Sequence, residues 1–244
     1  MNYLIVGGSS GLGKCIAYNF AEHGIQTTLL SSDKRDTERI IEDIYLRFNI
    51  KNNYIQFDFT NYSEDVIYRE LKKLKKINGI IFTIGLVSDK DSFLVDGMDE
   101  DLLKTLFDVN VLSVIRLVNT ALKFLDSNSH IIGIGSVAAI KGRSKNVYYS
   151  SAKSALKTYF ESLRHFSDIK NRYNVQLYTL GYMDSGSTYN MNLPLPRGKN
   201  VKLSNFIRKN LNKKSKNYTY PLYWKPIIIF LTLCPPILFK YIKV

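Results

Sequence analysis

The chain has 244 residues, of which 45% are hydrophobic, so it can bury the core of one full domain. Its two cysteines, Cys15 and Cys234, argue against a disulfide scaffold and fit a reducing compartment, and its three histidines lack the spacing of metal ligands. The net charge of +13 is uneven, because eleven Lys and Arg and no acidic residue follow Asp184. The basicity therefore concerns a partner of the C-terminal tail rather than the main domain.

Short apolar runs alternate with longer amphipathic patterns along most of the chain. The runs predict strands at Tyr3–Val6, Thr27–Leu30, Tyr54–Phe57, Gly79–Ile84, Ser129–Gly135 and Val175–Leu180. The patterns predict helices at Leu12–His23, Lys34–Phe48, Ser63–Lys75, Asp99–Leu125 and Val147–Tyr173. This alternation predicts an α/β fold, with a Rossmann-like doubly wound parallel sheet in a single domain.

The C-terminal part of the chain has a different composition. Regular patterning is lost after Ser185 and returns at Val201. We expect a core over residues 1–190, a basic substrate-side loop or lid with a helix over residues 191–219, and an apolar C-terminal segment over residues 220–244. The tail is therefore a basic and apolar extension of the domain.

The first strand runs directly into a glycine-rich turn, Val6–Gly13. Gly7 lets the chain turn off the strand, Gly11 lets the backbone approach a pyrophosphate, and Gly13 lets the next helix pack closely on the sheet. The helix N-terminus then faces the phosphates. Because the turn heads a βαβ pattern, it predicts a dinucleotide site. The expected cofactor contacts are Gly7, Ser9, Ser10, Gly11, Leu12 and Gly13.

The end of the second strand helps to choose between NADP and NAD. An acidic residue about 20 residues after the glycine turn holds the ribose 2′-hydroxyl of NAD, but that position is Ser31, followed by Ser32. A hydroxyl does not repel a 2′-phosphate. Basic residues lie nearby at Lys14, Lys34 and Arg35. The pattern favours NADP, while NAD stays open because Asp33 can turn inward. Asp58, after the third strand, is placed to reach the adenine.

A tyrosine and a lysine stand four residues apart in the segment Asn146–Leu156. On a helix this spacing puts Tyr149 and Lys153 on one face, one turn apart. A nearby ammonium stabilises a phenolate and lowers the phenol pKa from about 10. Such a tyrosine can protonate an alkoxide or deprotonate an alcohol while a hydride moves. We predict that Tyr149 is the general acid/base and Lys153 its electrostatic partner.

Two further polar residues complete this pattern. Ser136 closes the fifth predicted strand, and its hydroxyl can hold the same carbonyl oxygen. Asn110 lies in the middle of a predicted helix, where an amide does not help packing, and it can position the lysine through a water. The predicted catalytic residues are Tyr149, Lys153, Ser136 and Asn110.

The glycine turn, Asn110, Ser136 and the Tyr149–Lys153 pair resemble, in this order, the short-chain dehydrogenases/reductases. The resemblance covers about residues 1–188 and implies an NAD(P)-dependent oxidoreductase with an Asn-Ser-Tyr-Lys tetrad. It implies further cofactor contacts from Gly85, Gly181, Ser185, Tyr149 and Lys153. The chain departs from the family pattern in three places: at Val6, at Phe82-Thr83-Ile84 before Gly85, and at Leu180 before Gly181.

A narrower resemblance is to a membrane-associated branch of this family, the decaprenylphosphoryl-2-keto-ribose reductases. It rests on Phe82-Thr83-Ile84-Gly85, on Trp224 and on the run Pro235-Pro236-Ile237-Leu238-Phe239-Lys240. This resemblance implies a polyprenyl-phosphate keto-sugar as substrate and a flavin oxidase as partner. The wider family implies a homo-oligomer that pairs through the long helices.

The apolar run Pro226–Phe239 has three interpretations. It is shorter than the about 20 residues of a membrane span and contains prolines, which disfavours a span. It can dock on the protein's own core or on a second subunit. It can also rest on a bilayer, because the aromatic residues and lysines around it suit the headgroup region. Nucleic acid is not expected as a partner, because no binding motif accompanies the charge.

The sequence as a whole predicts a cytoplasmic enzyme, peripheral at the inner face of the membrane. We expect it to reduce a carbonyl, or to oxidise a secondary alcohol, on an amphiphilic substrate such as a polyprenyl-phosphate keto-sugar or a lipid ketone. Two alternatives stay open. One is a soluble oligomeric ketoreductase of a small metabolite. The other is an interaction protein that senses NADP without turnover.

Overall fold

The structure is a computed structural model that describes residues 1–74, 76–91, 99–142, 146–185 and 193–239. These residues form one sheet of seven parallel strands in the order β3-β2-β1-β4-β5-β6-β7. The strands are β1 (Asn2–Val6), β2 (Gln26–Ser31), β3 (Asn53–Gln56), β4 (Ile77–Phe82), β5 (Leu125–Ser136), β6 (Asn174–Leu180) and β7 (Lys216–Tyr220). The order reverses between β1 and β4, so the predicted doubly wound fold is confirmed.

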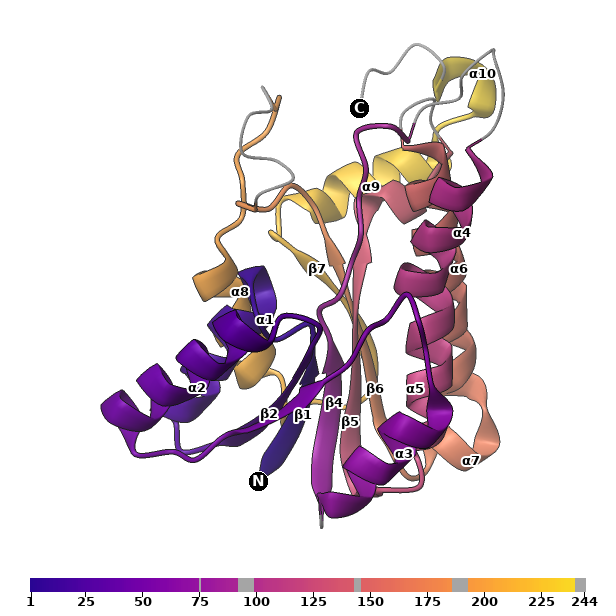
Figure 1. Ribbon diagram of the computed structural model, residues 1–244. Coiled ribbons are helices and arrows are strands. Elements are labelled where there is room, and N and C mark those ends of the chain that lie inside the picture. The colour runs from indigo at the N-terminus through magenta and orange to yellow at the C-terminus, as the bar shows by residue number, and fades with distance from the viewer. Residues whose placement is uncertain (75, 92–98, 143–145, 186–192, 240–244) are drawn as a thin grey trace.

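Helices cover both faces of the sheet (Figure 1). On one face lie α1 (Gly11–Glu22), α2 (Lys34–Phe48) and α8 (Asn200–Lys209). On the other lie α3 (Glu64–Lys73), α5 (Ser113–Ala121) and α6 (Val147–His165). The remaining elements are α4 (Glu100–Phe107), the π-helical turn η1 (Asp108–Leu112), the short turn η2 (Val137–Ala139), α7 (Ser167–Lys170), α9 (Trp224–Leu233) and α10 (Pro236–Phe239).

Strand β1 shows why the central strands are apolar without a break. Leu4 and Val6 pack into the hydrophobic cluster under α5 and α6, whereas Tyr3 and Ile5 pack into the cluster under α1 and α8. Successive side chains of a strand point to opposite faces, so a strand covered on both faces is apolar at every position. The two clusters together form the core of the domain.

Two of the predicted helices are shorter in the structure than in the prediction. The helix expected over Asp99–Leu125 is divided by η1, where Asn110 donates a side-chain hydrogen bond to the carbonyl of Leu106 at 2.9 Å. Such π-helical turns are frequent at functional sites. The helix expected over Val147–Tyr173 ends at His165, because Phe166 takes an extended backbone with ψ of 124°.

The region expected to be a basic loop with a helix contributes two elements to the domain. Helix α8 packs against α1, where the Asn19 side chain donates to that of Asn205 at 2.9 Å. Residues Lys216–Tyr220 form β7, a strand that the sequence patterns did not predict. It lies at the edge of the sheet, and its lysine-rich flank is typical of an edge strand.

Trp224 anchors α9 to the domain. Its side chain is completely buried and meets Tyr182 edge-on, with ring centroids 5.1 Å apart. The indole also fills the space beside Gly181, where an added Cβ would lie 1.9 Å from Nε1. None of the described helices is both long and apolar enough to cross a bilayer. The tail is therefore fixed to the protein at the start of α9.

Replacing Trp224 with alanine is expected to lower the free energy of unfolding by about 3–5 kcal/mol, because it removes a large, fully buried side chain. Urea unfolding followed by circular dichroism measures this change. Leu233→Ala is the control, because Leu233 is on the same helix and 77% exposed; its cost should stay within about 0.5 kcal/mol. Equal effects of the two substitutions would contradict the packing of α9.

Candidate active site

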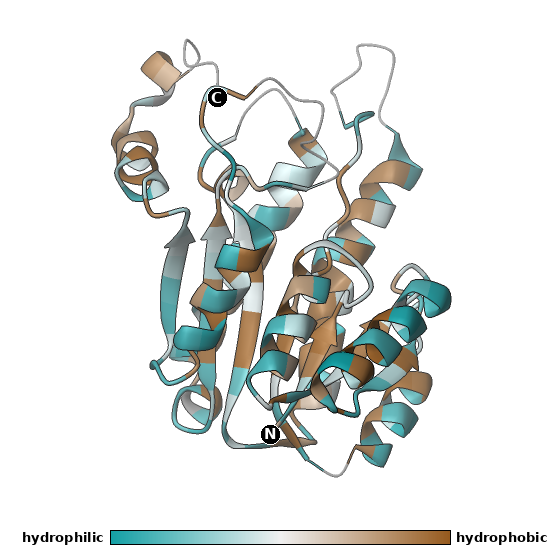
Figure 2. Ribbon diagram, turned by 90° about the vertical axis from the view of Figure 1, so that its left-hand side faces the viewer, coloured by the Kyte–Doolittle hydropathy of each residue, from teal (hydrophilic) through white to brown (hydrophobic). Residues whose placement is uncertain are grey.

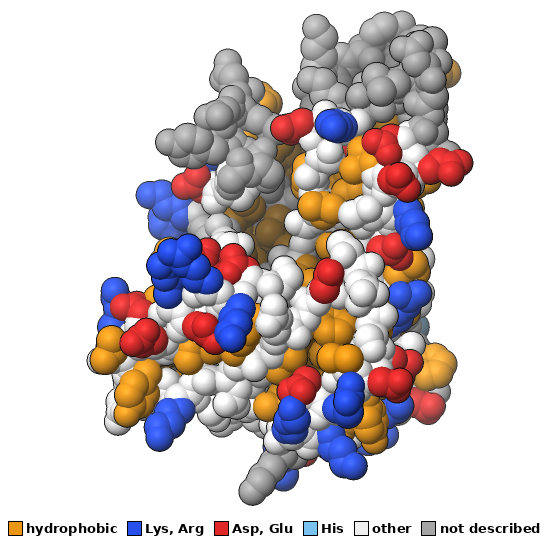
Figure 3. All heavy atoms as spheres, viewed as in Figure 1, with side chains coloured by type: hydrophobic (Ala, Val, Ile, Leu, Met, Phe, Trp, Pro, Cys, Tyr) orange, Lys and Arg blue, Asp and Glu red, His pale blue; other side chains and the backbone are white. Residues whose placement is uncertain are grey.

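Four neighbouring strands bring most of the predicted site residues to the carboxyl ends of the strands. The glycine turn follows β1, Gly85 lies just beyond β4, Ser136 ends β5, and Gly181 follows β6. In an open parallel sheet, ligands bind at the carboxyl ends of the strands, next to the point where the strand order reverses. Figure 3 shows the molecule hollowed at this end, with hydrophobic side chains at the depth of the hollow.

The glycine turn has the shape that a pyrophosphate needs. Gly7 has a left-handed backbone, with φ of 90°, and its N–H donates to the carbonyl of Leu30 at 2.8 Å. Gly13 packs so closely that an added Cβ would lie 2.2 Å from the Gly7 carbonyl oxygen. At Gly11, with φ of 50°, an added Cβ would meet nothing within 4 Å, so this backbone faces open space. The turn fits a dinucleotide phosphate, with Ser9, Ser10 and Leu12 around the start of α1.

Thr83 is a part of this site that the sequence analysis did not single out. Its hydroxyl donates to the carbonyls of Val6 at 2.8 Å and Gly7 at 3.1 Å, so it ties the end of β4 to the glycine turn. The signal was present in the departure from the family pattern before Gly85. A hydroxyl at this position holds the turn in place from the neighbouring strand.

The residues predicted to meet the adenosine half of the cofactor follow β2 and β3. Ser31 is buried, and its Oγ accepts the backbone N–H of Asp33 at 3.1 Å. The Asp33 carboxylate caps α2 by accepting the N–H of Asp36 at 2.9 Å. Ser32 is exposed. The exposed Asp58 accepts hydrogen bonds from the hydroxyl and the backbone N–H of Thr60. Both bonds lower the pKa of its carboxyl, and the bond from the hydroxyl has the larger effect.

Lys153 is the most unusual charge in the site. Its side chain is only 3% exposed, and its Nζ lies 5.8 Å from the centre of the Tyr149 ring. Within the described part of the chain, its hydrogen-bond acceptor is the carbonyl of Ile134 at 3.3 Å. Burial lowers the pKa of Lys153 from 10.5 to about 8, because the ammonium loses its hydration. The helix spacing predicted for Tyr149 and Lys153 is present in α6.

Asn110 and Gly85 form the wall beside this ammonium. Asn110 is fully buried, and its side chain accepts the N–H of Leu86 at 3.2 Å and donates to the Leu86 carbonyl at 3.0 Å. A Cβ added at Gly85 would lie 3.5 Å from Lys153 Nζ and 3.6 Å from Asn110 Oδ1. The structure thus brings Asn110 and Lys153 to the same small residue.

Ser136 approaches from the end of β5. Its Oγ accepts the backbone N–H of Ala138 at 3.1 Å, so its own O–H group can donate to a substrate oxygen. The next turn, η2, is bound to α6 by the hydroxyl of Ser154, which donates to the Ala139 carbonyl at 3.2 Å. Ser154 follows Lys153, so the strand end and the helix are fixed close to the predicted catalytic groups.

Gly181 and Ser185 follow β6, the last of the four strands whose carboxyl ends form the site. Gly181 donates its N–H to the Tyr220 carbonyl at 2.9 Å and packs under the Trp224 indole. Ser185 follows the segment Tyr182–Asp184, which pairs with Gly198. The structure therefore gives Gly181 a packing role, while cofactor contacts from either residue stay predictions.

This arrangement suits proton transfer at one oxygen. Tyr149 can donate its phenolic proton to that oxygen, Ser136 can donate a hydrogen bond to it, and the Lys153 ammonium can stabilise the phenolate that results. A bound nicotinamide would supply or accept the hydride. The chain's own side chains would hold the oxygen and move the proton.

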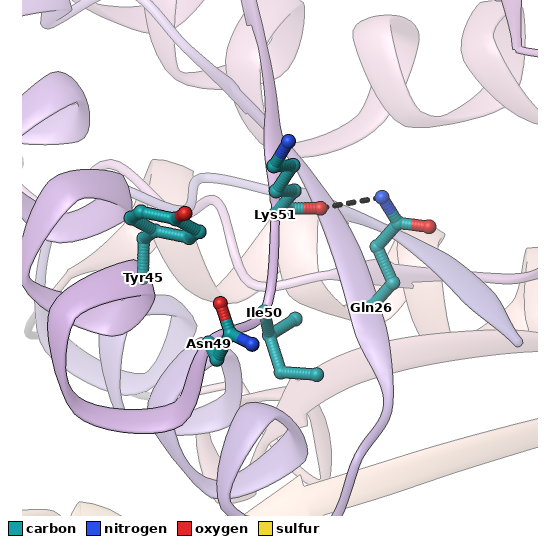
Figure 4. Close-up of a pocket in the computed structure, with 5 residues that line it drawn as sticks. All are labelled: Gln26, Tyr45, Asn49, Ile50 and Lys51. Carbon is teal, nitrogen blue, oxygen red and sulfur yellow. Dashed lines mark hydrogen bonds between the residues drawn. The ribbon is translucent and has the colours of Figure 1, made fainter.

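A second hollow, of about 530 Å³, lies near the amino end of β2. It is lined by Gln26, Tyr45, Asn49, Ile50 and Lys51, and Gln26 donates a hydrogen bond to the Lys51 carbonyl (Figure 4). Gln26 begins β2, whereas the glycine turn lies where the strands end. None of the predicted site residues lines this hollow, so it is separate from the candidate active site.

Comparison with known proteins agrees with this arrangement. Residues 2–194 match the sequence profile of the family described as short chain dehydrogenase. The chain is 29% identical over 190 residues to the hydroxysteroid 11-beta-dehydrogenase 1-like protein of Xenopus tropicalis, covering 75% of this chain and 65% of that protein. It is 25% identical over 166 residues to the very-long-chain 3-oxoacyl-CoA reductase of Homo sapiens, covering 66% and 52%. The chain spans less than two thirds of the length of either relative.

Solved structures share the fold at lower identity. A short chain dehydrogenase of Escherichia coli CFT073, complexed with NADPH, is 16% identical with a TM-score of 0.80, covering 89% of this chain and 95% of that chain. One from Salmonella enterica serovar Typhi is 15% identical with a TM-score of 0.80, covering 89% and 94%. These likenesses concern the fold.

Replacing Lys153 with methionine is expected to stabilise the ligand-free protein at neutral pH. The folded pKa of about 8 lies below the ordinary 10.5, so the ammonium opposes folding in full below about pH 8, and this cost disappears as the pH rises towards 10.5. It corresponds to roughly 3 kcal/mol. Urea unfolding should show a gain of that order at pH 7 that fades by about pH 10.

The matched control is Lys157→Met, one turn further along α6. Lys157 pairs with Glu161 at 3.1 Å, and both side chains are about one third exposed. Loss of such a pair changes stability by less than about 1 kcal/mol. If Lys153→Met were no more stabilising than Lys157→Met at pH 7, the proposed cost of the buried ammonium would be wrong.

Proposed function

Because the chain belongs to the short-chain dehydrogenase family, we propose that it is an NADP-dependent reductase that acts on a carbonyl, or in reverse on the corresponding secondary alcohol. The observation that carries the proposal is the buried Lys153 ammonium beside the ring of Tyr149. In this proposal Tyr149 is the general acid/base, Lys153 lowers the pKa of its phenol, Ser136 holds the carbonyl oxygen, and Asn110 supports Lys153.

The proposal favours NADP over NAD because of the residues after β2. The carboxylate of Asp33, the nearest acidic group, is engaged as the cap of α2. Ser32 is exposed and uncharged, and Lys34 and Arg35 are exposed beside it. Lys34 pairs with Glu38 at 3.7 Å, so Arg35 is the basic residue that the proposal assigns to a 2′-phosphate. The structurally similar E. coli protein is complexed with NADPH. In the proposal, Gly7, Gly11 and Gly13 cradle the pyrophosphate and Asp58 reaches the adenine.

A cofactor-sensing protein without turnover is the rival from another class. It would need the cofactor site and not the proton-transfer residues. The burial of Lys153 and the π-helical turn at Asn110 argue against it, because a buried ammonium is costly, π-helical turns are rare, and sensing requires neither. Turnover of any carbonyl with NADPH would exclude it.

Tyr149→Phe is expected to lower kcat for carbonyl reduction by about 10²–10⁴-fold, because it removes the transferred proton. The dissociation constant for NADPH should rise far less than kcat falls, because the glycine turn and the other predicted cofactor contacts remain. A panel of a long-chain ketone, a steroid ketone and an o-quinone, assayed with NADPH and NADH, provides the measurement, and fluorescence titration reports cofactor binding.

Tyr159→Phe is the matched control, on the same helix. The Tyr159 hydroxyl is buried and has no hydrogen-bond partner among the described residues, so its removal should leave kcat unchanged. Full hydride transfer by Tyr149→Phe would refute the mechanism. A wild-type protein that binds NADPH but reduces nothing would favour the sensor.

The proposed substrate is amphiphilic, because the C-terminal helices present an apolar face near the site. Trp224, Leu231 and Cys234 point into the protein. Five other apolar side chains of α9 and α10 are more than half exposed: Ile229, Phe230, Leu233, Ile237 and Leu238. Figure 2 shows these hydrophobic helices at the end of the molecule that carries the carboxyl ends of the strands. Two of the relatives are named for a hydroxysteroid and a very-long-chain 3-oxoacyl-CoA, which also favours a lipid ketone.

Lys141 joins the end of this apolar helix to the segment between Ser136 and Tyr149. Its ammonium donates to the carbonyls of Cys234 and Leu231, at the end of α9, and lies 5.0 Å from the centre of the Phe239 ring. In sequence, Lys141 stands between Ser136 and Tyr149. A surface that binds α9 would therefore contact the segment that connects two of the proposed catalytic residues.

The basic residues of the tail do not share one face with α9. Lys216 begins β7 and pairs with Gln176 at the start of β6, so Lys213, Lys214 and Lys216 lie towards the amino ends of the strands. Helix α9 follows β7 and lies at the carboxyl ends. We therefore propose that contact with a bilayer depends mainly on the apolar residues of α9 and α10, with Lys225 as an exposed charge beside them.

The resemblance to the decaprenylphosphoryl-2-keto-ribose reductases gives the proposal its most specific form. In that form the substrate is a polyprenyl-phosphate keto-sugar, the partner is a flavin oxidase, and the enzyme works in lipid-linked sugar or polysaccharide biosynthesis at the inner face of the membrane. A homo-oligomer through the long helices fits the same proposal. The alternative is a soluble oligomeric ketoreductase, in which a second subunit covers the apolar face of α9.

Introducing acidic side chains into the apolar face is expected to abolish binding to lipid vesicles. The double variant Ile229→Glu/Leu233→Glu replaces side chains that are 60% and 77% exposed, so it should fold normally. Flotation with vesicles of anionic and neutral phospholipid measures the binding. The control Lys213→Glu/Lys214→Glu introduces the same number of acidic side chains towards the amino ends of the strands. It should retain most of the wild-type flotation.

Sedimentation of the same proteins distinguishes the alternative. If Ile229→Glu/Leu233→Glu turned an oligomer into monomers while the wild-type protein did not float, the face would be a subunit interface. Equal flotation of both double variants would contradict the lipid-binding role of α9.

A further inference from the structure

The N-terminus of the helix that carries Tyr149 is capped by a residue from another part of the chain. Asn146, just before α6, has a left-handed backbone with φ of 56°, and its side chain makes no capping hydrogen bond. The carboxylate of Asp91 instead accepts the backbone N–H of Tyr148 at 2.8 Å and of Tyr149 at 2.7 Å, one on each oxygen. These are the two positions that a capping side chain next to the helix normally serves.

Asp91 is itself firmly held. Its side chain is only 3% exposed. Its backbone carbonyl accepts the N–H of Asn146 at 3.0 Å, and its own N–H donates to the Ser88 carbonyl at 3.2 Å. A buried carboxylate is costly unless it is hydrogen-bonded, and the positive end of a helix dipole favours its charge. The paired bonds to Tyr148 and Tyr149 are therefore charge-assisted and directional.

The loop that carries Asp91 is tied to the catalytic site at its other end too. Asn110 binds both the N–H and the carbonyl of Leu86, next to Gly85, and Gly85 lies against the Lys153 ammonium. The segment from Gly85 to Asp91 thus runs from the side of the Lys153 ammonium to the backbone of Tyr149. One loop spans the two groups whose separation decides the ionisation of the phenol.

We propose that Asp91 is a positioning residue for the reaction. By holding the backbone of Tyr149, it fixes the phenol relative to the Lys153 ammonium and the substrate oxygen. The inference rests on the proposed role of Tyr149 as general acid/base and extends it to a residue outside the tetrad. Displacement of a reacting group by about 1 Å is enough to lower a rate by roughly 100-fold.

The test compares Asp91→Ala, which removes both acceptors, with Asp91→Asn, which keeps one. Asp89→Asn is the matched control, because Asp89 is exposed on the same loop. With the carbonyl that the wild-type protein reduces, Asp91→Ala should lower kcat by about 10- to 100-fold, and Asp91→Asn by less. The dissociation constant for NADPH should rise far less than kcat falls, because the glycine turn and most of the predicted cofactor contacts are untouched. Asp89→Asn should match the wild type.

Amide hydrogen exchange of the ligand-free proteins supplies a readout without turnover. Exchange at Tyr148 and Tyr149 should accelerate in Asp91→Ala and stay unchanged in Asp89→Asn. Unchanged kcat per folded molecule in Asp91→Ala would overturn the proposal, because the cap would then be only structural. If Asp91→Ala does not fold, Asp91→Asn decides by the same criteria.

Failure of the proposed function gives a different result. A wild-type protein that reduces no carbonyl would refute the reductase. The exchange experiment would then still decide whether Asp91 holds the backbone of Tyr149. Faster exchange in Asp91→Ala would support this role of Asp91, and unchanged exchange would overturn it.

Discussion

The burial of one ammonium organises this end of the molecule. Lys153 is buried with the Ile134 carbonyl as its acceptor within the described residues, and the loss of hydration brings its pKa down to about 8. A charge in such a place opposes folding, so the surrounding structure must be fixed by other means. The surrounding structure consists of helix α6, Gly85 and Asn110 in its π-helical turn. The energetic cost of burying the ammonium is explained if its charge acts on Tyr149.

The C-terminal tail connects this buried site to the surface. Trp224 fills the space beside Gly181, so the start of α9 belongs to the wall of the domain, whereas the outer side of α9 exposes Ile229, Phe230 and Leu233. Lys141 ties the end of α9 to the loop between Ser136 and Tyr149. The same helix therefore packs on its own core along one side and exposes apolar side chains along the other. Docking on the protein's own core, one interpretation of the tail, fits the buried side of α9, whereas contact of the exposed side with a bilayer or a second subunit stays a prediction.

Local patterns were enough to predict most of the sheet, because each buried parallel strand is an apolar run and each covering helix is amphipathic. They predicted Tyr149, Lys153, Asn110 and Ser136 as one group, and in the structure all four lie towards the carboxyl ends of the strands. They did not predict β7, whose lysines and tyrosines form no apolar run, or the π-helical turn, which depends on the tertiary contact between Asn110 and Leu86. Asp91 had no signal either, because its role depends on a helix 58 residues away along the chain.

The ionisation of Tyr149 tests the central claim most directly. Carbon-13 labelling of tyrosine at Cζ allows each phenol to be titrated by NMR, and Tyr149→Phe identifies the resonance of Tyr149. If the buried ammonium activates this phenol, its pKa in the wild-type protein lies below the usual value of about 10, and Lys153→Met moves it upward. A Tyr149 resonance that titrates at the same pH in both proteins would contradict the account.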